Sequence, residues 1–214
     1  MDQQILFLIN RTWTNPTLDQ IMAMASSFDL WAPVLFLIAG LTLLFGGFRA
    51  RAFLVCVGVV VAIADGITVQ TLKETVARPR PNDIRNDVRI VDLAKAKPRL
   101  LALGKPLQIK MSKVSTKPVK GNSFPSGHVV NNFGIATVLF AFYRRWGWLA
   151  FFPAALVSYS RVYVGSHWPS DILVSALLAI GLASVLLALL SLAWEKWGPR
   201  WMAKAFAKNP KLLA

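Results

Sequence analysis

The sequence predicts an all-α, integral-membrane helical bundle with about five transmembrane helices and N-terminal interfacial helices. Hydrophobic residues make up 55% of the 214 residues and charged residues only 16%, far more apolar than a soluble domain. A soluble α-protein with buried helices is disfavoured because several apolar runs approach or reach the length that crosses a bilayer. The fourth run is the weakest, since its last turns are polar. The runs are Leu30–Phe48, Ala52–Leu72, Ser126–Tyr143, Trp148–Val164 and Asp171–Trp194.

Residues 1–29 precede the first run and cannot span a membrane. Their short apolar stretch "ILFLIN", together with Trp13 and the amphipathic "LDQIMAMASSF", predicts helices that lie along the membrane surface. A basic leader and a secretory cleavage site are missing, so we expect no removal of this segment. Residues 1–214 are expected to form a single membrane domain. The one cysteine, Cys56, lies in the second run and excludes an intrachain disulfide.

The net charge of +14 is concentrated in particular segments. Residues 73–120 hold thirteen Lys and Arg residues against four acids. Nucleic-acid binding is the usual interpretation of such a balance. Here, however, the charge lies on a basic loop, residues 73–125, between two membrane helices and without interleaved aromatic residues for base stacking. We therefore expect no nucleic-acid partner and favour membrane lipids and an anionic phosphate substrate, although a merely solvated loop accounts for part of the charge.

Each run crosses the membrane once, so the number of runs between two helix ends determines whether their polar residues lie on the same side. The second run ends near Lys73 and the third begins near Ser126, so these two ends lie on one side of the membrane. The fourth run ends near Val164 and the fifth begins near Asp171, which places both on that same side. The stretches "KETVARPRP", "FPSGH" and "SRVYVGSHWPSD" are therefore predicted to converge at one face.

Both histidines of the chain, His128 and His167, fall within these converging stretches. Lys73, Arg80 and Arg161 supply positive charge at the same helix ends. Arg suits bidentate phosphate binding, and Lys suits a point-charge contact. Each cation alone is more simply interpreted as a snorkelling interfacial residue. The five together favour a phosphate site.

The start of the third run has the features of an anion-binding helix N-terminus. Ser126 is a suitable cap, and Gly127 leaves backbone N–H groups uncovered. At the start of the fifth run, Asp171 follows His167 by four residues, close enough to hold its imidazole if the segment turns helically. The same position also suits an aspartate that only complements the helix dipole.

An aspartate, Asp65, lies inside the second run, two turns before Lys73. An ionisable group within a membrane helix is a candidate functional residue. A structural hydrogen bond or ion pair with a neighbouring helix is the simpler interpretation.

The complete pattern resembles the type 2 phosphatidic acid phosphatase family, which shares its site with the vanadium haloperoxidases and glucose-6-phosphatase. Lys73 is followed after six residues by Arg80-Pro81. Then come Pro125-Ser126-Gly127-His128, and finally Ser160-Arg161, five residues, His167, three residues and Asp171. Every fixed residue of the three-part motif is present at its spacing, between Lys73 and Asp171.

The resemblance implies a metal-independent phosphatase without a cofactor. His167 would be the nucleophile that forms a phosphohistidine, and Asp171 would orient and activate it. His128 would protonate the leaving oxygen and then help to activate water. The phosphoryl oxygens would be held by Lys73, Arg80, Ser126, Gly127 and Arg161. The sequence holds no cluster of carboxylates and histidines at metal-ligand spacing, and the cations take a metal's place.

The function expected is hydrolysis of a lipid phosphate or lipid diphosphate. Undecaprenyl diphosphate, phosphatidylglycerol phosphate, phosphatidic acid and lipid A phosphate all remain open as substrates. Transfer to a hydroxyl acceptor instead of water is equally compatible with the sequence. A non-catalytic lipid binder or transporter is disfavoured by the intact histidines, and a vanadate-dependent oxidase is disfavoured by the membrane runs.

Basic residues predict the orientation only in part. Short loops and the basic C-terminal tail, residues 195–214, carry most of the charge opposite the site, which favours a cytoplasmic location for that face. The site-side loop holds more cations in absolute number, and we discount these because several of them would bind phosphate. The resemblance favours an outward site, so we expect a bacterial cytoplasmic (inner) membrane protein whose site faces the periplasm or exterior. The residues opposite the site are Arg49, Arg51, Arg144, Arg145, Lys196, Arg200, Lys204, Lys208 and Lys211.

Overall fold

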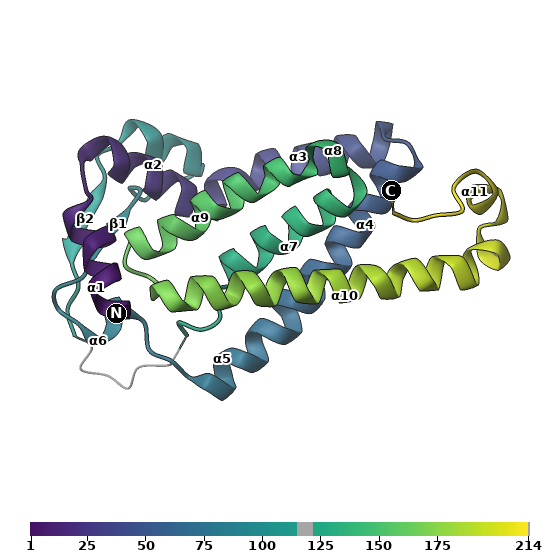
Figure 1. Ribbon diagram of the computed structural model, residues 1–214. Helices are drawn as coiled ribbons and strands as arrows, with labels where there is room; N and C mark the ends of the chain where they lie inside the picture. The colour runs from purple at the N-terminus through teal and green to yellow at the C-terminus, as the bar shows by residue number, and fades with distance from the viewer. Residues whose placement is uncertain (115–121, 214) are drawn as a thin grey trace.

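The computed structural model describes residues 1–114 and 122–213 and shows a lengthwise bundle of helices (Figure 1). Lys117 and Lys120, which belong to the predicted basic loop, lie outside the described residues. The bundle is built from α3 (Phe28–Phe45), α4 (Phe48–Ile63), α7 (Gly127–Phe142), α9 (Phe151–Tyr163) and α10 (Pro169–Trp201). Helix α7 packs against α4, α9 and α10 and is thus the central helix.

Three helical stretches among the described residues are long and apolar enough to cross a membrane: α3, the stretch that starts with α4, and α10. At about 1.5 Å per residue, the 18 residues of α3 span roughly 27 Å, close to the hydrocarbon thickness of a bilayer. Large apolar side chains such as Phe36, Phe45 and Leu177 are exposed on the outside of the bundle. A lipid environment accounts for this exposure, and the predicted all-α membrane bundle is confirmed.

Helix boundaries depart from the apolar runs in two places. Helix α4 continues through a π-helical turn, η2 (Ala64–Val69), into α5 (Gln70–Val76). Helix α10 has 33 residues and continues beyond Trp194, so the predicted tail begins as a helix and also contains α11 (Ala203–Lys208). An apolar run ends where the chain leaves the membrane, whereas the backbone hydrogen bonds of the helix continue past that point. A short helix, α8 (Arg144–Gly147), and a 3₁₀ turn, η4 (Trp148–Ala150), join α7 to α9.

The N-terminal segment forms three helical pieces at the end of the bundle where α10 begins (Figure 1). They are α1 (Asp2–Phe7), the π-helical η1 (Leu8–Thr12) and α2 (Pro16–Ser26). Asn15 caps α2 by accepting a hydrogen bond from the Leu18 N–H at 2.8 Å, and Pro16 follows at the first helical position.

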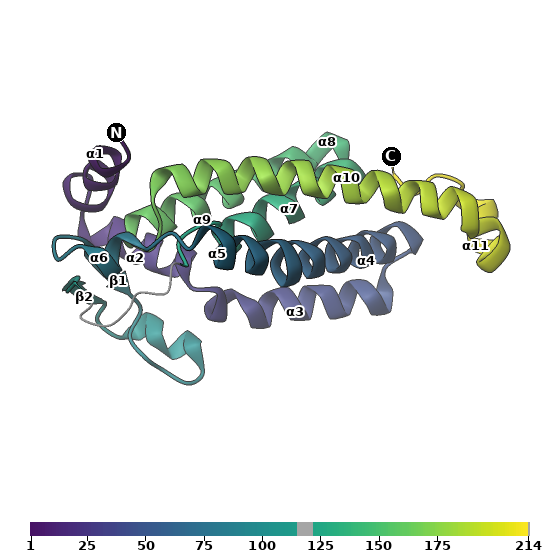
Figure 2. The ribbon, with the colours of Figure 1, turned by 90° about the horizontal axis from the view of Figure 1, so that it is seen from below.

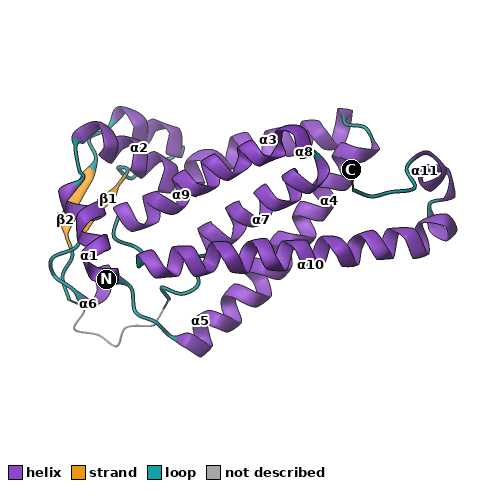
Figure 3. Ribbon diagram, viewed as in Figure 1, coloured by secondary structure: helices purple, strands orange, loops and turns teal. Residues whose placement is uncertain are grey.

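Residues 81–111 of the predicted basic loop form a folded cap. It contains α6 (Pro81–Ile84), β1 (Arg89–Asp92), a 3₁₀ helix η3 (Arg99–Gly104) and β2 (Gln108–Met111), as Figure 3 shows. The two strands pair antiparallel, with Val91 opposite Ile109. Each strand has only four residues, RIVD and QIKM, which is too short for a clear period-two pattern in the sequence.

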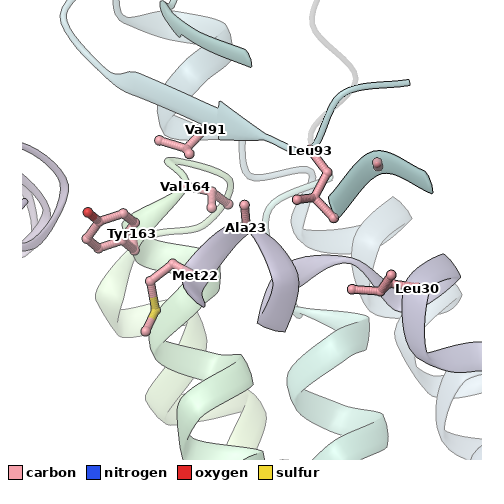
Figure 4. Close-up of a cluster of buried hydrophobic side chains, with 8 residues drawn as sticks. Met22, Ala23, Leu30, Val91, Leu93, Tyr163 and Val164 are labelled. Carbon is pink, nitrogen blue, oxygen red and sulfur yellow. The ribbon is translucent and has the colours of Figure 1, made fainter. Parts of the chain in front are cut away.

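Buried side chains join this cap to the bundle, as the close-up in Figure 4 shows. The cluster draws on α2, α3, the cap and the end of α9, and its members are Met22, Ala23, Leu30, Val91, Leu93, Ala102, Tyr163 and Val164. Asn10 is also fully buried and donates to the carbonyl oxygens of Arg89 at 2.7 Å and Tyr163 at 2.6 Å. Its own side-chain oxygen accepts from the Arg89 N–H at 2.8 Å. The end of α9 is therefore held from two sides.

Candidate active site

The structure brings the predicted site residues to one end of the bundle. Lys73 lies in the last turn of α5, His128 in the first turn of α7, and Arg161 in the last turn of α9. The charges of Arg161, Lys73 and Arg80 all act on His128. Arg161, Arg80 and His128 act in turn on His167. Figures 1 and 2 both show these helix ends in the half of the molecule that also contains α1 and β1.

A sharp reversal of the chain places His167. Helix α9 ends at Tyr163, and Gly165 follows with a φ of +76°, a conformation that side-chain-bearing residues rarely adopt. A Cβ at this glycine would also lie 2.4 Å from Val88 Cγ1 and 2.8 Å from the Arg89 carbonyl oxygen. The N–H groups of Ser166 and His167 both donate to the Arg161 carbonyl oxygen. His167 is consequently fixed in the turn between α9 and α10 and is only 3% exposed.

Ser123 determines which nitrogen of His167 carries the proton. His167 Nδ1 lies 2.6 Å from the Ser123 carbonyl oxygen. A carbonyl oxygen only accepts hydrogen bonds, so Nδ1 must be the protonated nitrogen. In the neutral ring, Nε2 then keeps its lone pair. This is the tautomer that a nucleophilic histidine requires.

Asp171 meets His167 through Ser123 and not directly, which differs from the expected contact. Within residues 1–114 and 122–213, its carboxylate accepts from the Ser123 hydroxyl at 2.5 Å, from Arg78 and from the Trp168 N–H at 3.1 Å, but not from the imidazole. The reason is that α10 begins at Pro169, so His167 lies before the helix. The spacing of four residues therefore does not place the two side chains on one helical face.

Arg78 is the cation that neutralises Asp171. Its guanidinium donates to Asp171 at 2.5 Å, to Asp2 at 2.7 Å and to the Ser170 hydroxyl at 2.9 Å. Ser170 also donates to Asp2 through its N–H and its hydroxyl. Burial alone would raise the pKa of Asp2, but the hydrogen bonds from Ser170 and Arg78 outweigh it and lower that pKa. Helix α1 is thus tied to the carboxylate of the site.

The start of α7 forms the other wall. The Ser126 N–H donates to the Ser175 hydroxyl of α10 at 2.9 Å, which fixes the position of the "PSGH" turn against α10. A Cβ at Gly127 would lie 2.9 Å from Asp65 Oδ1, so the glycine permits the close approach of that carboxylate. Asp65 therefore lies against the start of α7, and its charge acts on His128.

Three of the predicted phosphate-binding side chains have buried polar atoms without a protein partner. Arg80 Nε, Arg161 Nε and Ser126 Oγ are each buried and make no hydrogen bond to any described residue. Buried polar atoms in folded proteins are almost always hydrogen-bonded. Arg161 is held in place through a different nitrogen, Nη1, which donates to Ser26. These donors fit a tetrahedral anion with several acceptor oxygens.

The electrostatics of the turn keep His167 neutral. Burial is the largest influence and lowers the pKa of His167 well below its usual range. The positive charges of Arg161 and Arg80 act in the same direction, while the Ser123 carbonyl opposes them. At neutral pH the ring is therefore uncharged and carries its proton on Nδ1.

The side chains of this protein that could bind a metal ion together are its carboxylates, histidines and cysteine. Across the described parts of the sequence, no three such side chains lie together as possible metal ligands. The groups nearest to the histidines are instead guanidinium and ammonium cations. This donor set suits an anion.

Sequence reasoning did not identify Arg78, Ser123 or Ser175. Ser123 lies within the stretch "NSFPSGH" but three residues before the fixed serine of the motif. Arg78 lies between Lys73 and Arg80 and was one of many cations in a basic segment. A second arginine two residues before Arg80 was the only local signal for it.

Known proteins resemble the chain over the same region. The family model described as the PAP2 superfamily matches residues 49–195, which include the whole motif from Lys73 to Asp171. The lipid A 4'-phosphatase of Bacteroides thetaiotaomicron is 28% identical over 184 residues, 83% of this chain and 72% of that protein. The undecaprenyl-diphosphatase of Sulfolobus acidocaldarius is 42% identical over 79 residues, 36% of this chain and 35% of that protein.

Two solved structures share the fold. The crystal structure of Aquifex aeolicus LpxE superposes with a TM-score of 0.61 at 24% identity and covers 87% of this chain and 94% of its own. The first transmembrane PAP2 type phosphatidylglycerolphosphate phosphatase from Bacillus subtilis gives a TM-score of 0.52 at 20% identity, with 87% and 85% covered. At these identities the likeness concerns the helical architecture.

Proposed function

The chain belongs to the PAP2 superfamily, and on that premise we propose that it is a membrane phosphatase that hydrolyses a lipid phosphate or lipid diphosphate. One observation carries the proposal. Two histidines meet at a helix end together with three buried donor groups, on Arg80, Arg161 and Ser126, that have no partner among the described residues. A phosphoryl group supplies the acceptors that these donors lack.

In the first step, Nε2 of His167 attacks phosphorus. The N–P bond forms as the bond from phosphorus to the lipid oxygen breaks, and the departing oxygen takes a proton from His128. Lys73, Arg80 and Arg161 stabilise the charge on the equatorial oxygens, which is the main requirement of phosphoryl transfer. The products of this step are a phosphohistidine and the lipid alcohol, or the lipid monophosphate when the substrate is a lipid diphosphate.

In the second step, water replaces the lipid oxygen. His128, now neutral, accepts a proton from the attacking water as the new P–O bond forms and the N–P bond breaks. His167 returns to its neutral form with the proton still on Nδ1. Free phosphate leaves, and the enzyme is regenerated without any change of oxidation state.

Asp171 serves this chemistry through Ser123. Its carboxylate accepts the Ser123 hydroxyl and thereby holds the residue whose carbonyl oxygen selects the tautomer of His167. The Arg78 guanidinium balances the charge of Asp171. The backbone carbonyl oxygen of Arg78 accepts a hydrogen bond from the Ser123 N–H at 2.9 Å. The hydroxyl, the carbonyl and the N–H of Ser123 are therefore all engaged.

The relatives support an amphiphilic substrate. One is named for lipid A and the other for undecaprenyl diphosphate, and the first resembles this chain over most of its length. A phosphorylated lipid A headgroup is accordingly the first substrate to test. Transfer of the phosphoryl group to a hydroxyl acceptor is the second candidate, because the same phosphohistidine would serve it.

We place the protein in the bacterial cytoplasmic (inner) membrane with its site facing the periplasm or exterior. Cations on the short loops and tail opposite the site support this orientation. Paired fusions at Ala214 test it: fluorescence from a GFP fusion with inactive alkaline phosphatase is expected. An active alkaline phosphatase with dark GFP would reverse the orientation.

Phosphate release by the purified protein tests the function. The panel contains phosphorylated lipid A, undecaprenyl diphosphate, phosphatidylglycerol phosphate and phosphatidic acid, with His167→Ala as the blank. Release from at least one lipid and none from the blank is expected. Adding a lipid or sugar alcohol and looking for a phosphorylated acceptor separates transfer from hydrolysis. A protein that binds these lipids without releasing phosphate would be a binder or transporter.

A further inference from the structure

The 3₁₀ helix η3 of the cap exposes three of its leucines. Leu100, Leu101 and Leu103 are 52%, 59% and 38% exposed, whereas Ala102 between them is 1% exposed. Ala102 belongs to the buried cluster of Figure 4, so η3 is anchored to the protein through this small residue and through the hydrogen bonds of Arg99. About half of the surface of these apolar side chains therefore faces away from the protein.

This exposed tip lies beside the start of α3. Helix η3 contacts α3, and Arg99 Nε donates at 3.3 Å to the hydroxyl of Ser27, the residue that precedes α3. In Figure 2 the corresponding teal segment lies beside the end of α3. Phe28 and Trp31 in the first turns of α3 are also exposed. Tryptophan side chains concentrate where hydrocarbon meets headgroups, so Trp31 marks that depth.

Cations surround the leucines. Lys95 and Lys97 precede η3, Lys105 follows it, and all three are exposed. None of the three forms an ion pair with a residue that the structure describes, whereas Arg99 is paired with Asp92. An apolar tip ringed by free lysines is the pattern of a segment that lies in an interface of anionic lipids.

We propose that η3 is a membrane-docking tip that inserts Leu100, Leu101 and Leu103 among the acyl chains of the leaflet on the site side. Lys95, Lys97 and Lys105 then contact anionic headgroups at its edge. The proposal is independent of catalysis and goes beyond the proposed function. The cap would rest on the bilayer and not only on the bundle, and anionic lipids would gather beside the site. Tyr163 and Val164, which lead into the His167 turn, share the buried cluster with Ala102.

A fluorescent label tests the position of the tip. Cys56 is replaced by Ala, which leaves no other thiol. Leu101→Cys is then labelled with the environment-sensitive dye NBD, and the protein is placed in nanodiscs that contain phosphatidylglycerol. The matched control is Gln108→Cys, an exposed position on β2 in the same cap. Figures 1 and 2 show this strand on the side of the cap away from the bundle.

Blue-shifted emission and quenching by lipids with brominated acyl chains are expected at position 101 but not at position 108. The shift should decrease in pure phosphatidylcholine, and also when Lys95, Lys97 and Lys105 are all changed to Gln. Identical water-like emission at both positions would overturn the proposal. A blue shift without bromine quenching would also overturn it, because another protein surface or a second copy would then cover the tip. None of these readouts depends on phosphatase activity.

Discussion

The Nδ1 atom of His167 lies 2.6 Å from the carbonyl oxygen of Ser123, and the hydroxyl of the same serine donates to Asp171. One residue thus contacts both the proposed nucleophile and the carboxylate that was expected to orient it. The arrangement separates two functions that a direct Asp–His pair combines: selecting the tautomer and supplying negative charge.

Replacement of either histidine should strongly reduce phosphate release, for a different reason in each case. His167→Ala removes the nucleophile and should reduce phosphate release to the blank. His128→Ala removes the acid and base and should reduce turnover by about 10²–10⁴-fold. Because His128 also activates water, radiolabelled phosphate should accumulate on His167 in the His128→Ala protein with a substrate whose leaving group needs no proton. Near-wild-type activity in either variant would refute the assignment.

Ser123→Ala should lower kcat by roughly 10- to 100-fold, which corresponds to the loss of one buried hydrogen bond to a charged group. The carbonyl contact to His167 remains in this variant, so KM should change little. Asp171→Asn should be at least as damaging. The double variant should be no worse than Asp171→Asn alone, because both changes break the same contact. Additive losses would mean that Asp171 acts independently of Ser123.

The pKa of His167 should lie well below the usual value near 6.5, since burial and then Arg161 and Arg80 disfavour the charged ring. Neutral His167 should consequently persist as pH falls below 6.5, and protonation should remove the nucleophile only at more acidic pH. The His128→Gln protein contains a single histidine, so ¹⁵N NMR of labelled histidine reports both its pKa and its tautomer. Titration at or above 6.5, or a proton on Nε2, would contradict the structure.

Chelation should leave the activity intact, because the cations of the site supply the charge stabilisation. Phosphate release is measured after treatment with EDTA and dialysis, with and without added Mg²⁺. Vanadate should inhibit competitively by taking the place of the phosphoryl group in the five-coordinate transition state. Activity that disappears with EDTA and returns with Mg²⁺ would show that a metal takes part.

Gly165→Ala should destabilise the protein by more than the roughly 1–2 kcal/mol that a left-handed conformation costs, because the new Cβ would also meet Val88 and the Arg89 carbonyl oxygen. Activity should fall as well, since the turn places His167. Gly181→Ala is the matched control: that glycine lies within α10 with no atom within 4 Å of an added Cβ. Thermal unfolding in detergent should show a lower Tm for the first variant only.

The sequence predicted the bundle well because a bilayer forces apolar side chains into runs of fixed length. Counting those runs assigned each helix end to one side of the membrane. That assignment predicted that His128 and His167 lie at the same face. The contacts within the site were less predictable. Asn10 bonds to Tyr163 from 153 positions away, and no local pattern reports such a pairing. The Asp171 spacing was misleading because Pro169 starts the helix after His167, so the aspartate turns back to the Trp168 N–H.

Asn10 lies outside the region of homology, yet its side chain bonds to two residues within that region. The region of homology is therefore smaller than the unit that can fold. The superfamily match covers residues 49–195 and includes every motif residue. A fragment cut to that region would nevertheless lose Asn10, which satisfies three backbone groups of Arg89 and Tyr163. It would also lose Asp2, the second anion on Arg78, and Ser26, the support of Arg161. A sequence can therefore contain a complete catalytic signature and still lack the parts that keep it assembled.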